Sequence, residues 1–330
     1  MAVALEREAE AATLEVAASA AVHTVDLGKR YGAITALAGL SMTVPRGEVF
    51  GFLGPNGAGK TTAVKLLVGL ARPTSGEAWV LGAPIGDRET RRRIGYLPEL
   101  FRYQDWLTAR EALALHAELA GLPRAVRMDE VVSALATVGL AARGDDRVGT
   151  FSKGMQQRLG LGASLLGKPE LVLLDEPTSA LDPVGRHDVR EIIRALKARG
   201  TTVFLNSHLL SEVEQVCDRV AIVNEGHVVA MGTMDDVLGA ASSVRLRVTG
   251  LDAPAIAGLR HYGDLATEAG WLTIRGIDAE AVPDLVDAIV RLGGRVYAVE
   301  PRHQTLEDRF LQLLERPADA PVDHRPTDPA

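Results

Sequence analysis

The sequence has one cysteine, no long apolar run and fewer basic than acidic residues, and each shortage excludes a class of protein. The single cysteine, Cys217, cannot form an internal disulfide, which suits a reducing cytoplasm. No run of about 18 apolar residues is present, so no transmembrane helix is encoded. Residues 1–20 carry four glutamates and no unbroken apolar centre. They are therefore no secretory signal and form either an acidic, alanine-rich helix or a disordered arm.

Composition and charge indicate a globular protein that does not coat nucleic acid. The 330 residues are 47% hydrophobic and 24% charged, which suits one large domain and a small one. The formal net charge of −7 disfavours binding along a phosphate backbone, because such binding needs a basic surface. The densest basic cluster, Arg91 to Arg93, is interpreted as solvated surface. No nucleic-acid partner is expected.

The order of apolar segments predicts an α/β fold around a parallel sheet. The continuous apolar run 171–174 is typical of a strand that is buried on both faces. Short strands are expected at 22–27 and 34–37, and two amphipathic helices are expected within 108–140. Beyond residue 240, strands and helices alternate, with a strand predicted at 265–274. This order suggests a small α+β domain of the ferredoxin-like type.

A phosphate-loop pattern lies between a predicted strand and a predicted helix. The run is Gly54-Pro55-Asn56-Gly57-Ala58-Gly59-Lys60-Thr61, followed by Thr62. Glycines let successive backbone N–H groups turn toward one phosphate, and the helix that begins at Lys60 points its positive end at the same group. Lys60 supplies a cation for the β- and γ-phosphates, and the Thr61 hydroxyl is a ligand for Mg²⁺. The motif predicts a nucleoside triphosphate bound with Mg²⁺.

Two carboxylates, Asp175 and Glu176, follow the apolar run 171–174. A strand that ends in carboxylates places them at the carboxyl edge of a parallel sheet, where such sheets bind ligands. We expect Asp175 to hold Mg²⁺, directly or through water. We expect Glu176 to polarise the attacking water as a general base.

These residues, together with further motifs, resemble those of the ATP-binding cassette (ABC) family. The most specific match is the run Phe151-Ser152-Lys153-Gly154-Met155-Gln156-Gln157-Arg158. It is similar to the family signature Leu-Ser-Gly-Gly-Gln, which is usually followed by Gln and Arg. The Ser-Lys-Gly-Met variant resembles the branch of drug and polyketide exporters of the daunorubicin-resistance (ABC-2) type. Taken alone, Ser152 could also be an ordinary helix N-cap.

The resemblance implies roles for four more positions. The run Ser179-Ala180-Leu181-Asp182 matches the D-loop, His208 matches the switch histidine, and Tyr31 matches the aromatic residue that stacks on adenine. Glu99 stands where the family's Q-loop normally has glutamine. An ionised Glu99 can contact Mg²⁺ or the attacking water through oxygen, but it cannot donate a hydrogen bond. The implied catalytic residues are Glu176, His208, Lys60 and Glu99. The implied metal ligands are Thr61, Asp175 and Glu99. Besides the phosphate loop, the residues implied to bind ATP are Tyr31, Ser152, Gly154 and Asp182.

The fold implied by the resemblance is a P-loop NTPase cassette followed by a small α+β domain. The cassette combines a parallel-sheet core, an antiparallel β subdomain and a helical subdomain. The expected parts are a flexible arm at 1–20, the ATP-binding domain at 21–240 with its helical subdomain at about 100–165, an accessory domain at 241–316 and a disordered tail at 317–330. The run 304–310 is similar to the C-terminal extension of drug-exporter ATPases.

In this family two cassettes pack head to tail, so that Ser152 and Gly154 of one copy cap ATP at Lys60 of the other. The resemblance implies an ATPase that powers export of a hydrophobic, drug-like or lipid-like compound through a separate dimeric transmembrane permease. A homodimer on the cytoplasmic face of the membrane is the simpler expectation, and a heterodimer is not forbidden. The alternatives are an importer ATPase and a soluble cassette ATPase that acts on ribosomes or nucleic acid. The single cassette and the lack of heptads disfavour the soluble alternative.

Overall fold

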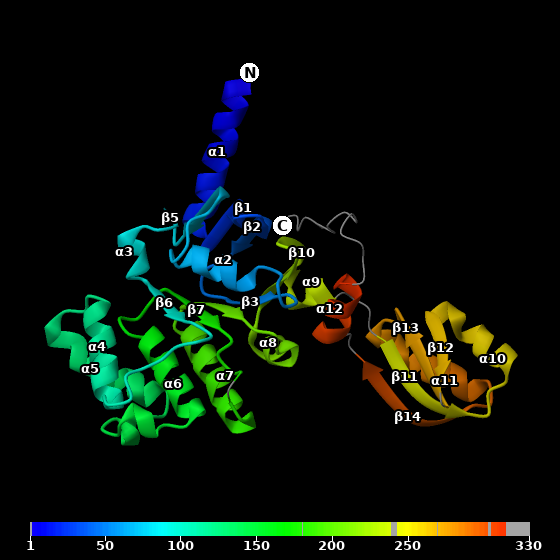
Figure 1. Ribbon diagram of the computed structural model, residues 1–330. Coiled ribbons are helices and arrows are strands. Elements are labelled where there is room, and N and C mark those ends of the chain that lie inside the picture. Colours follow the sequence, from blue (N-terminus) through cyan, green and yellow to red (C-terminus); the bar gives the residue numbers. More distant parts are fainter. Residues whose placement is uncertain (1, 180, 239–242, 269, 303–304, 315–330) are drawn as a thin grey trace. The chain divides into compact units, whose positions relative to one another are not determined.

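The chain divides into two compact units in the computed structural model, which describes residues 2–179, 181–238, 243–268, 270–302 and 305–314. The first unit runs to Met231 and the second begins at Gly232 (Figure 1). The expected domain boundaries after residues 20, 240 and 316 stay a prediction. Ala180 of the D-loop run, residue 304 of the extension and the expected tail 317–330 lie outside the described residues. Within the described residues, no helix combines the length and apolarity needed to cross a membrane.

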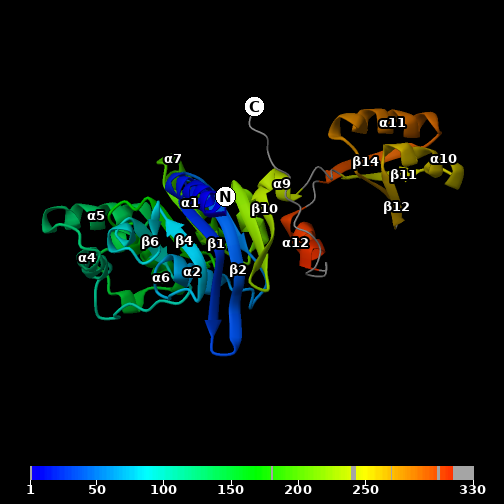
Figure 2. The same cartoon turned by 90° about the horizontal axis from the view of Figure 1, so that it is seen from above.

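An antiparallel sheet opens the first unit. Across the sheet its strands are β2 (Ile34–Val44), β1 (Val22–Tyr31), β4 (Ser75–Val80) and β5 (Ala83–Pro84). The predicted strands at 22–27 and 34–37 were too short, because β1 and β2 stay paired from Val22 opposite Val44 to Tyr31 opposite Ile34. Figure 2 shows this hairpin as a long arm of the sheet. The pairing includes exposed residues around the turn, and the later part of β2 buries the alternating residues Leu40, Met42 and Val44.

The second sheet of this unit is the predicted parallel core. Its strands in order are β10 (His227–Thr233), β9 (Arg219–Asn224), β3 (Val49–Leu53), β8 (Thr202–Asn206), β7 (Leu171–Asp175) and β6 (Ile94–Leu97). The neighbours β9, β3, β8, β7 and β6 pair in parallel. Every residue of β3, β7 and β8 is buried, as continuous apolar runs predict. The register puts Asp175 beside Asn206 at the carboxyl edge.

Helix α2 (Lys60–Leu67) joins the two sheets into one core. Its buried face packs in one cluster with strands of both sheets, including Leu27 and Leu37 on one side and Leu171 and Phe204 on the other. The helices α7 (Pro183–Ala198) and α8 (Leu210–Val216) pack against the parallel strands, and Cys217 is buried at the end of α8. This packing fixes the start of α2 relative to the ends of β3 and β7.

The remaining helices of the unit lie outside this core. A helical block next to β6 holds α4 (Ala109–Leu119), α5 (Arg124–Thr137) and α6 (Lys153–Ser164) (Figure 1). The first two confirm the helices predicted within 108–140, and Thr108 caps α4 in a reciprocal bond with Glu111. The short α3 (Arg88–Arg91) precedes β6. Residues Ala2–Ser19 form α1, which agrees with the helical alternative for the N-terminus.

The second unit has the β-α-β-β-α-β order of a ferredoxin-like domain. Its strands lie in the order β12 (Asp264–Glu268), β13 (Trp271–Arg275), β11 (Ser243–Thr249) and β14 (Arg295–Arg302), and its crossing helices are α10 (Ala253–Gly258) and α11 (Val282–Arg291). The single strand predicted at 265–274 is two strands, because Gly270 takes a left-handed turn at φ +80. The helices α9 (Met234–Leu238) and α12 (Leu306–Leu314) are joined by a bond from Arg309 to the Val237 carbonyl.

Candidate functional site

The phosphate loop connects β3 to α2 in a conformation that requires glycine. Gly57 and Gly59 have φ of +87 and +94, where side chains with a Cβ are strained. A Cβ on Gly59 would lie 2.3 Å from the Ala36 carbonyl oxygen, and one on Gly54 would lie 2.3 Å from that of Val223. The loop is therefore enclosed by β2 on one side and by the end of β9 on the other.

Lys60 lies at the start of α2 and joins the loop to an acidic edge. Its Nζ donates to the carbonyl oxygens of Gly54 at 2.7 Å and Pro55 at 3.0 Å. Burial lowers the pKa of Lys60, and the charges of Glu176, Asp175 and Glu99 oppose that shift. The charges of three predicted site residues, all carboxylates, thus act on the Lys60 ammonium group.

Asp175 is fixed at the end of β7 by a residue that the sequence motifs did not single out. Asn206, at the end of the neighbouring β8, donates from Nδ2 to the Asp175 carboxylate at 2.5 Å. Burial raises the pKa of Asp175, the Asn206 bond opposes this shift, and the charges of Glu99 and Glu176 add to it. Burial, with the charges of Asp175 and Glu99, also raises the pKa of Tyr96 to about 12. The sequence feature that could have identified Asn206 is a polar residue directly after the strand-forming run 202–205.

Glu176 and His208 meet directly. The Nδ1 atom of His208 lies 2.7 Å from Oε2 of Glu176, and the His208 backbone N–H donates to Oε1 at 3.0 Å. The Glu176 side chain is nearly buried, while that of His208 is 56% exposed. The two hydrogen bonds fix the orientation of the Glu176 carboxylate at the sheet edge where Lys60 lies.

The signature and D-loop residues form a separate group. Ser152 caps α6 by accepting a bond from the Met155 N–H, and Asp182 caps α7 by accepting one from Gly185. A Cβ on Gly154 would lie 3.2 Å from the Leu181 side chain, so the two helix starts are neighbours. Ser152 and Asp182 are exposed. In the described part of the chain, no hydrogen bond joins these residues to Lys60.

The other predicted site residues lie at the rim of the phosphate loop. Tyr31 is 49% exposed and sits at the end of β1, opposite Ile34, with the Lys29 ammonium 4.8 Å from its ring centroid. The following strand carries the Ala36 carbonyl that touches the loop. Asn56 and Thr61 are exposed, Pro55 and Thr62 are half-buried, and Ala58 is buried.

The carboxyl edge fits a divalent cation. Asp175, Glu176 and Glu99 act on Lys60 together, so three negative charges face one positive charge. The Oδ1 atom of Asn206 is buried beside Asp175 and has no hydrogen-bond partner among the described residues. No group of three acidic or histidine side chains forms a complete metal site in those residues. That combination suits Mg²⁺, which typically takes one or two carboxylates and shares its other ligands with phosphates and water.

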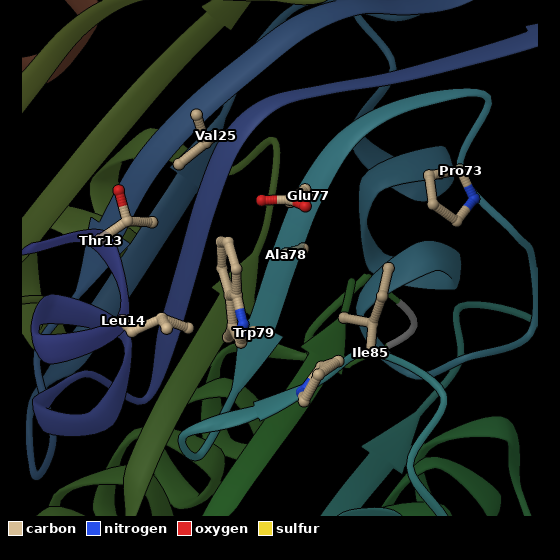
Figure 3. A pocket seen from close by; sticks show the side chains of 9 residues that line it. Thr13, Leu14, Val25, Pro73, Glu77, Ala78, Trp79 and Ile85 are labelled. Atoms are coloured by element: carbon tan, nitrogen blue, oxygen red, sulfur yellow. The ribbon is translucent and has the colours of Figure 1, made fainter. Parts of the chain in front are cut away.

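A cavity of about 570 Å³ lies elsewhere in the first unit, between α1 and the antiparallel sheet (Figure 3). Trp79 and Ile85 form part of its apolar wall, and Glu77 lies at the same wall. It includes no predicted site residue, so it is distinct from the phosphate loop.

A phosphate loop that faces the acidic end of a parallel sheet defines an NTPase of the phosphate-loop class. Residues 37–179 match the ABC transporter family. An uncharacterised ABC transporter ATP-binding protein of Nostoc sp. is 39% identical over 89% of this chain and 90% of its own length. The chain belongs to the ATP-binding subunits of ABC transporters, which are ATPases.

Two further relatives are a linearmycin resistance ATP-binding protein of Bacillus subtilis and a daunorubicin/doxorubicin resistance ATP-binding protein of Streptomyces peucetius. The first is 37% identical over 88% of this chain and 97% of its own length. The second is 35% identical over 91% and 94%. A solved ATP-binding subunit of an ABC transporter has a TM-score of 0.60 at 34% identity and covers 66% of this chain and 91% of its own. The resemblance to the drug-exporter branch and the predicted cassette fold are confirmed.

Proposed function

We propose that this ATPase powers export of a hydrophobic, drug-like compound through a separate membrane permease. The observation that carries the proposal is the convergence of Glu176, held by His208, with Lys60 of the phosphate loop. The names of the linearmycin and daunorubicin/doxorubicin resistance relatives support export rather than import. The match over most of the chain to transporter subunits disfavours a soluble cassette ATPase.

The phosphate loop and the acidic edge bind different parts of ATP and its metal ion. Backbone N–H groups of 54–61 and the start of α2 hold the phosphates, and Lys60 adds a mobile positive charge. Thr61, Asp175 and Glu99 would hold Mg²⁺, which, when bound, neutralises charge on the transferred phosphoryl group. The Asn206 bond keeps the Asp175 carboxylate oriented for that role. Tyr31, exposed on the neighbouring hairpin, would stack on adenine.

Glu176 supplies the base for hydrolysis. Its carboxylate takes a proton from water while the water oxygen bonds to the γ-phosphorus, and the bond to the β-phosphate oxygen breaks to leave ADP and phosphate. His208 positions the carboxylate through its ring Nδ1 and its backbone N–H. Because two bonds define the carboxylate plane, little reorientation is needed before proton transfer.

A second copy of the chain completes the site. Ser152 and Gly154 lie at the exposed start of α6, a helix of 12 residues whose positive end suits a phosphate. In this arrangement they cap the ATP bound at Lys60 of the other copy, with Asp182 beside them, and hydrolysis removes the contact that holds the dimer closed. The opening moves the permease from the cytoplasmic face of the membrane.

The proposal is tested by light scattering and phosphate release with Mg-ATP, comparing wild type with Glu176→Gln. The variant keeps the shape of the side chain but loses the base, so we expect turnover to fall about 10²–10⁴-fold. A stable ATP-dependent dimer is expected to accumulate. Glu191→Gln, on an exposed part of α7, is the matched control and should behave as wild type. If neither wild type nor Glu176→Gln dimerises with ATP, the homodimer is excluded.

A further inference from the structure

A buried amide links the signature helix to the backbone of the general base within one chain. Gln157 lies on α6 and is only 5% exposed. Its Nε2 donates to the backbone carbonyl of Glu176 at 3.4 Å. A carbonyl oxygen can only accept, so the Gln157 amide must present its nitrogen there.

The backbone at Glu176 needs support, because it is strained. Glu176 has φ +54, a left-handed conformation that is unfavourable for a residue with a Cβ. Such a conformation persists only where the surroundings hold it. The Glu176 N–H donates to the Asn206 carbonyl at 2.9 Å, and the Glu176 carbonyl accepts from the Ser179 hydroxyl at 3.1 Å as well as from Gln157. These contacts therefore fix the position of the Glu176 backbone, from which its side chain extends.

The same helix carries the groups that would contact ATP on the other copy. Ser152 and Gly154 begin α6, and Gln157 follows within its second turn. Arg158, the next residue, forms an ion pair with Asp188 of α7 at 2.7 Å, which ties α6 to the helix that follows the D-loop. A shift of α6 caused by a phosphate at its start is thus passed to the Glu176 carbonyl.

We propose that Gln157 is a positioning residue that makes each general base sensitive to the signature contact of its own chain. This inference rests on the proposed function and deepens it by naming a path between the two composite sites of the dimer. ATP capped by Ser152 of one copy moves α6 of that copy, and Gln157 then sets Glu176 in the same copy. The two sites become mutually dependent in the closed dimer, so each base reaches its full rate only when the signature contact of its own chain is made.

The test uses the full chain with Gln157→Met, which keeps the volume and unbranched shape but removes the donor. We expect kcat to fall about 10-fold, while the ATP concentration that gives the half-maximal rate changes little. The ATP Kd should stay within 2-fold of wild type. The double variant Gln157→Met/Glu176→Gln should still dimerise with ATP as Glu176→Gln does.

Ser179→Ala provides a second route, because it removes the other side-chain donor to the same carbonyl. We expect a smaller loss of kcat, and we expect the double variant with Gln157→Met to lose less than the product of the two single effects. Thr24→Val is the control for a lost buried hydrogen bond, since the Thr24 hydroxyl accepts from the Met42 N–H in the antiparallel sheet. It should lower Tm and leave kcat unchanged.

The outcomes separate the two proposals. Loss of ATP-dependent dimerisation or of turnover in wild type overturns the proposed function itself. Normal wild type with an unchanged kcat in Gln157→Met overturns the role of Gln157 alone. A loss of kcat in Gln157→Met that Thr24→Val reproduces at equal Tm also overturns it, because the effect would then be general destabilisation.

Discussion

The phosphate side of the cassette comprises residues 54–62, Glu99, Asp175, Glu176 and His208, and its signature side comprises Ser152, Gly154 and Asp182. On the phosphate side, polar groups bond to one another across elements, as in the contacts of His208 with Glu176. On the signature side, the side chains of Ser152 and Asp182 cap their own helices, and both residues are exposed. In the proposed mechanism one chain therefore supplies the chemistry, whereas closure requires a second cassette. Changes on the first side should affect ATP binding or chemistry, and changes on the second side should affect dimerisation.

The largest effect is expected from Lys60→Ala on the phosphate side. Removing a cation that interacts with the phosphates should weaken ATP binding about 10–100-fold, as expected for loss of charge-assisted hydrogen bonds. Turnover should fall about 10³-fold or more, because charge that develops in the transition state also loses its partner. Binding of a fluorescent ATP analogue and phosphate release measure the two effects. Lys65→Ala, on the exposed face of the same helix, is the control and should change neither.

Ser152→Asp tests the signature side without harming the fold. Aspartate caps helices as well as serine does, so α6 should remain intact. Its charge would meet the γ-phosphate of the other copy, and such a repulsion costs several kcal/mol, or about 10²-fold or more in turnover. ATP binding to the monomer should stay normal while ATP-dependent dimerisation disappears in light scattering. Ser152→Asn, an uncharged cap, should lose much less; equal defects in both variants would contradict the contact.

His208→Ala separates chemistry from binding on the phosphate side. Glu176 would keep its bond from the backbone N–H but lose the ring, so the base should become less well oriented. We expect kcat to fall about 10²-fold, in the range for a misplaced general base, with little change in ATP Kd. His187→Ala, at an exposed position on α7, is the matched control. A drop in ATP affinity without a drop in kcat would show that His208 contacts the nucleotide rather than positioning the base.

The sequence indicated candidate site residues wherever they belong to a contiguous motif, and their roles stay predictions. The phosphate loop, Asp175 and Glu176 were predicted because their residue types follow apolar strands directly, and the structure joins them at one edge. Asn206 and Gln157 were missed because their bonds depend on the register of two strands and on the placement of α6. Neither property is local in sequence, so no spacing rule could reveal these contacts.

The same distinction explains the errors in strand length. Buried strands such as 171–175 can be predicted because they consist almost entirely of consecutive apolar residues. Near its turn the β1–β2 hairpin extends over exposed residues, where backbone pairing holds the chain, whereas in the rest of β2 the buried residues Leu40, Met42 and Val44 are separated by small or polar residues and form no continuous apolar run. The break at Gly270 was missed because a left-handed turn between two short strands leaves the alternation of residues on either side largely intact.

The smallest expected effect distinguishes a helix cap from a contact across the dimer at Asp182. Its Oδ1 accepts from the Gly185 N–H at 2.7 Å, so Asp182→Ala should lower the free energy of unfolding by about 1 kcal/mol. Asp182→Asn keeps the cap and should unfold as wild type does in denaturant titrations. If the Asp182 carboxylate also contacts the second copy, the Asn variant should lose turnover several-fold at full stability. Wild-type turnover in Asp182→Asn would restrict this residue to capping α7 and leave Ser152 and Gly154 as the signature side.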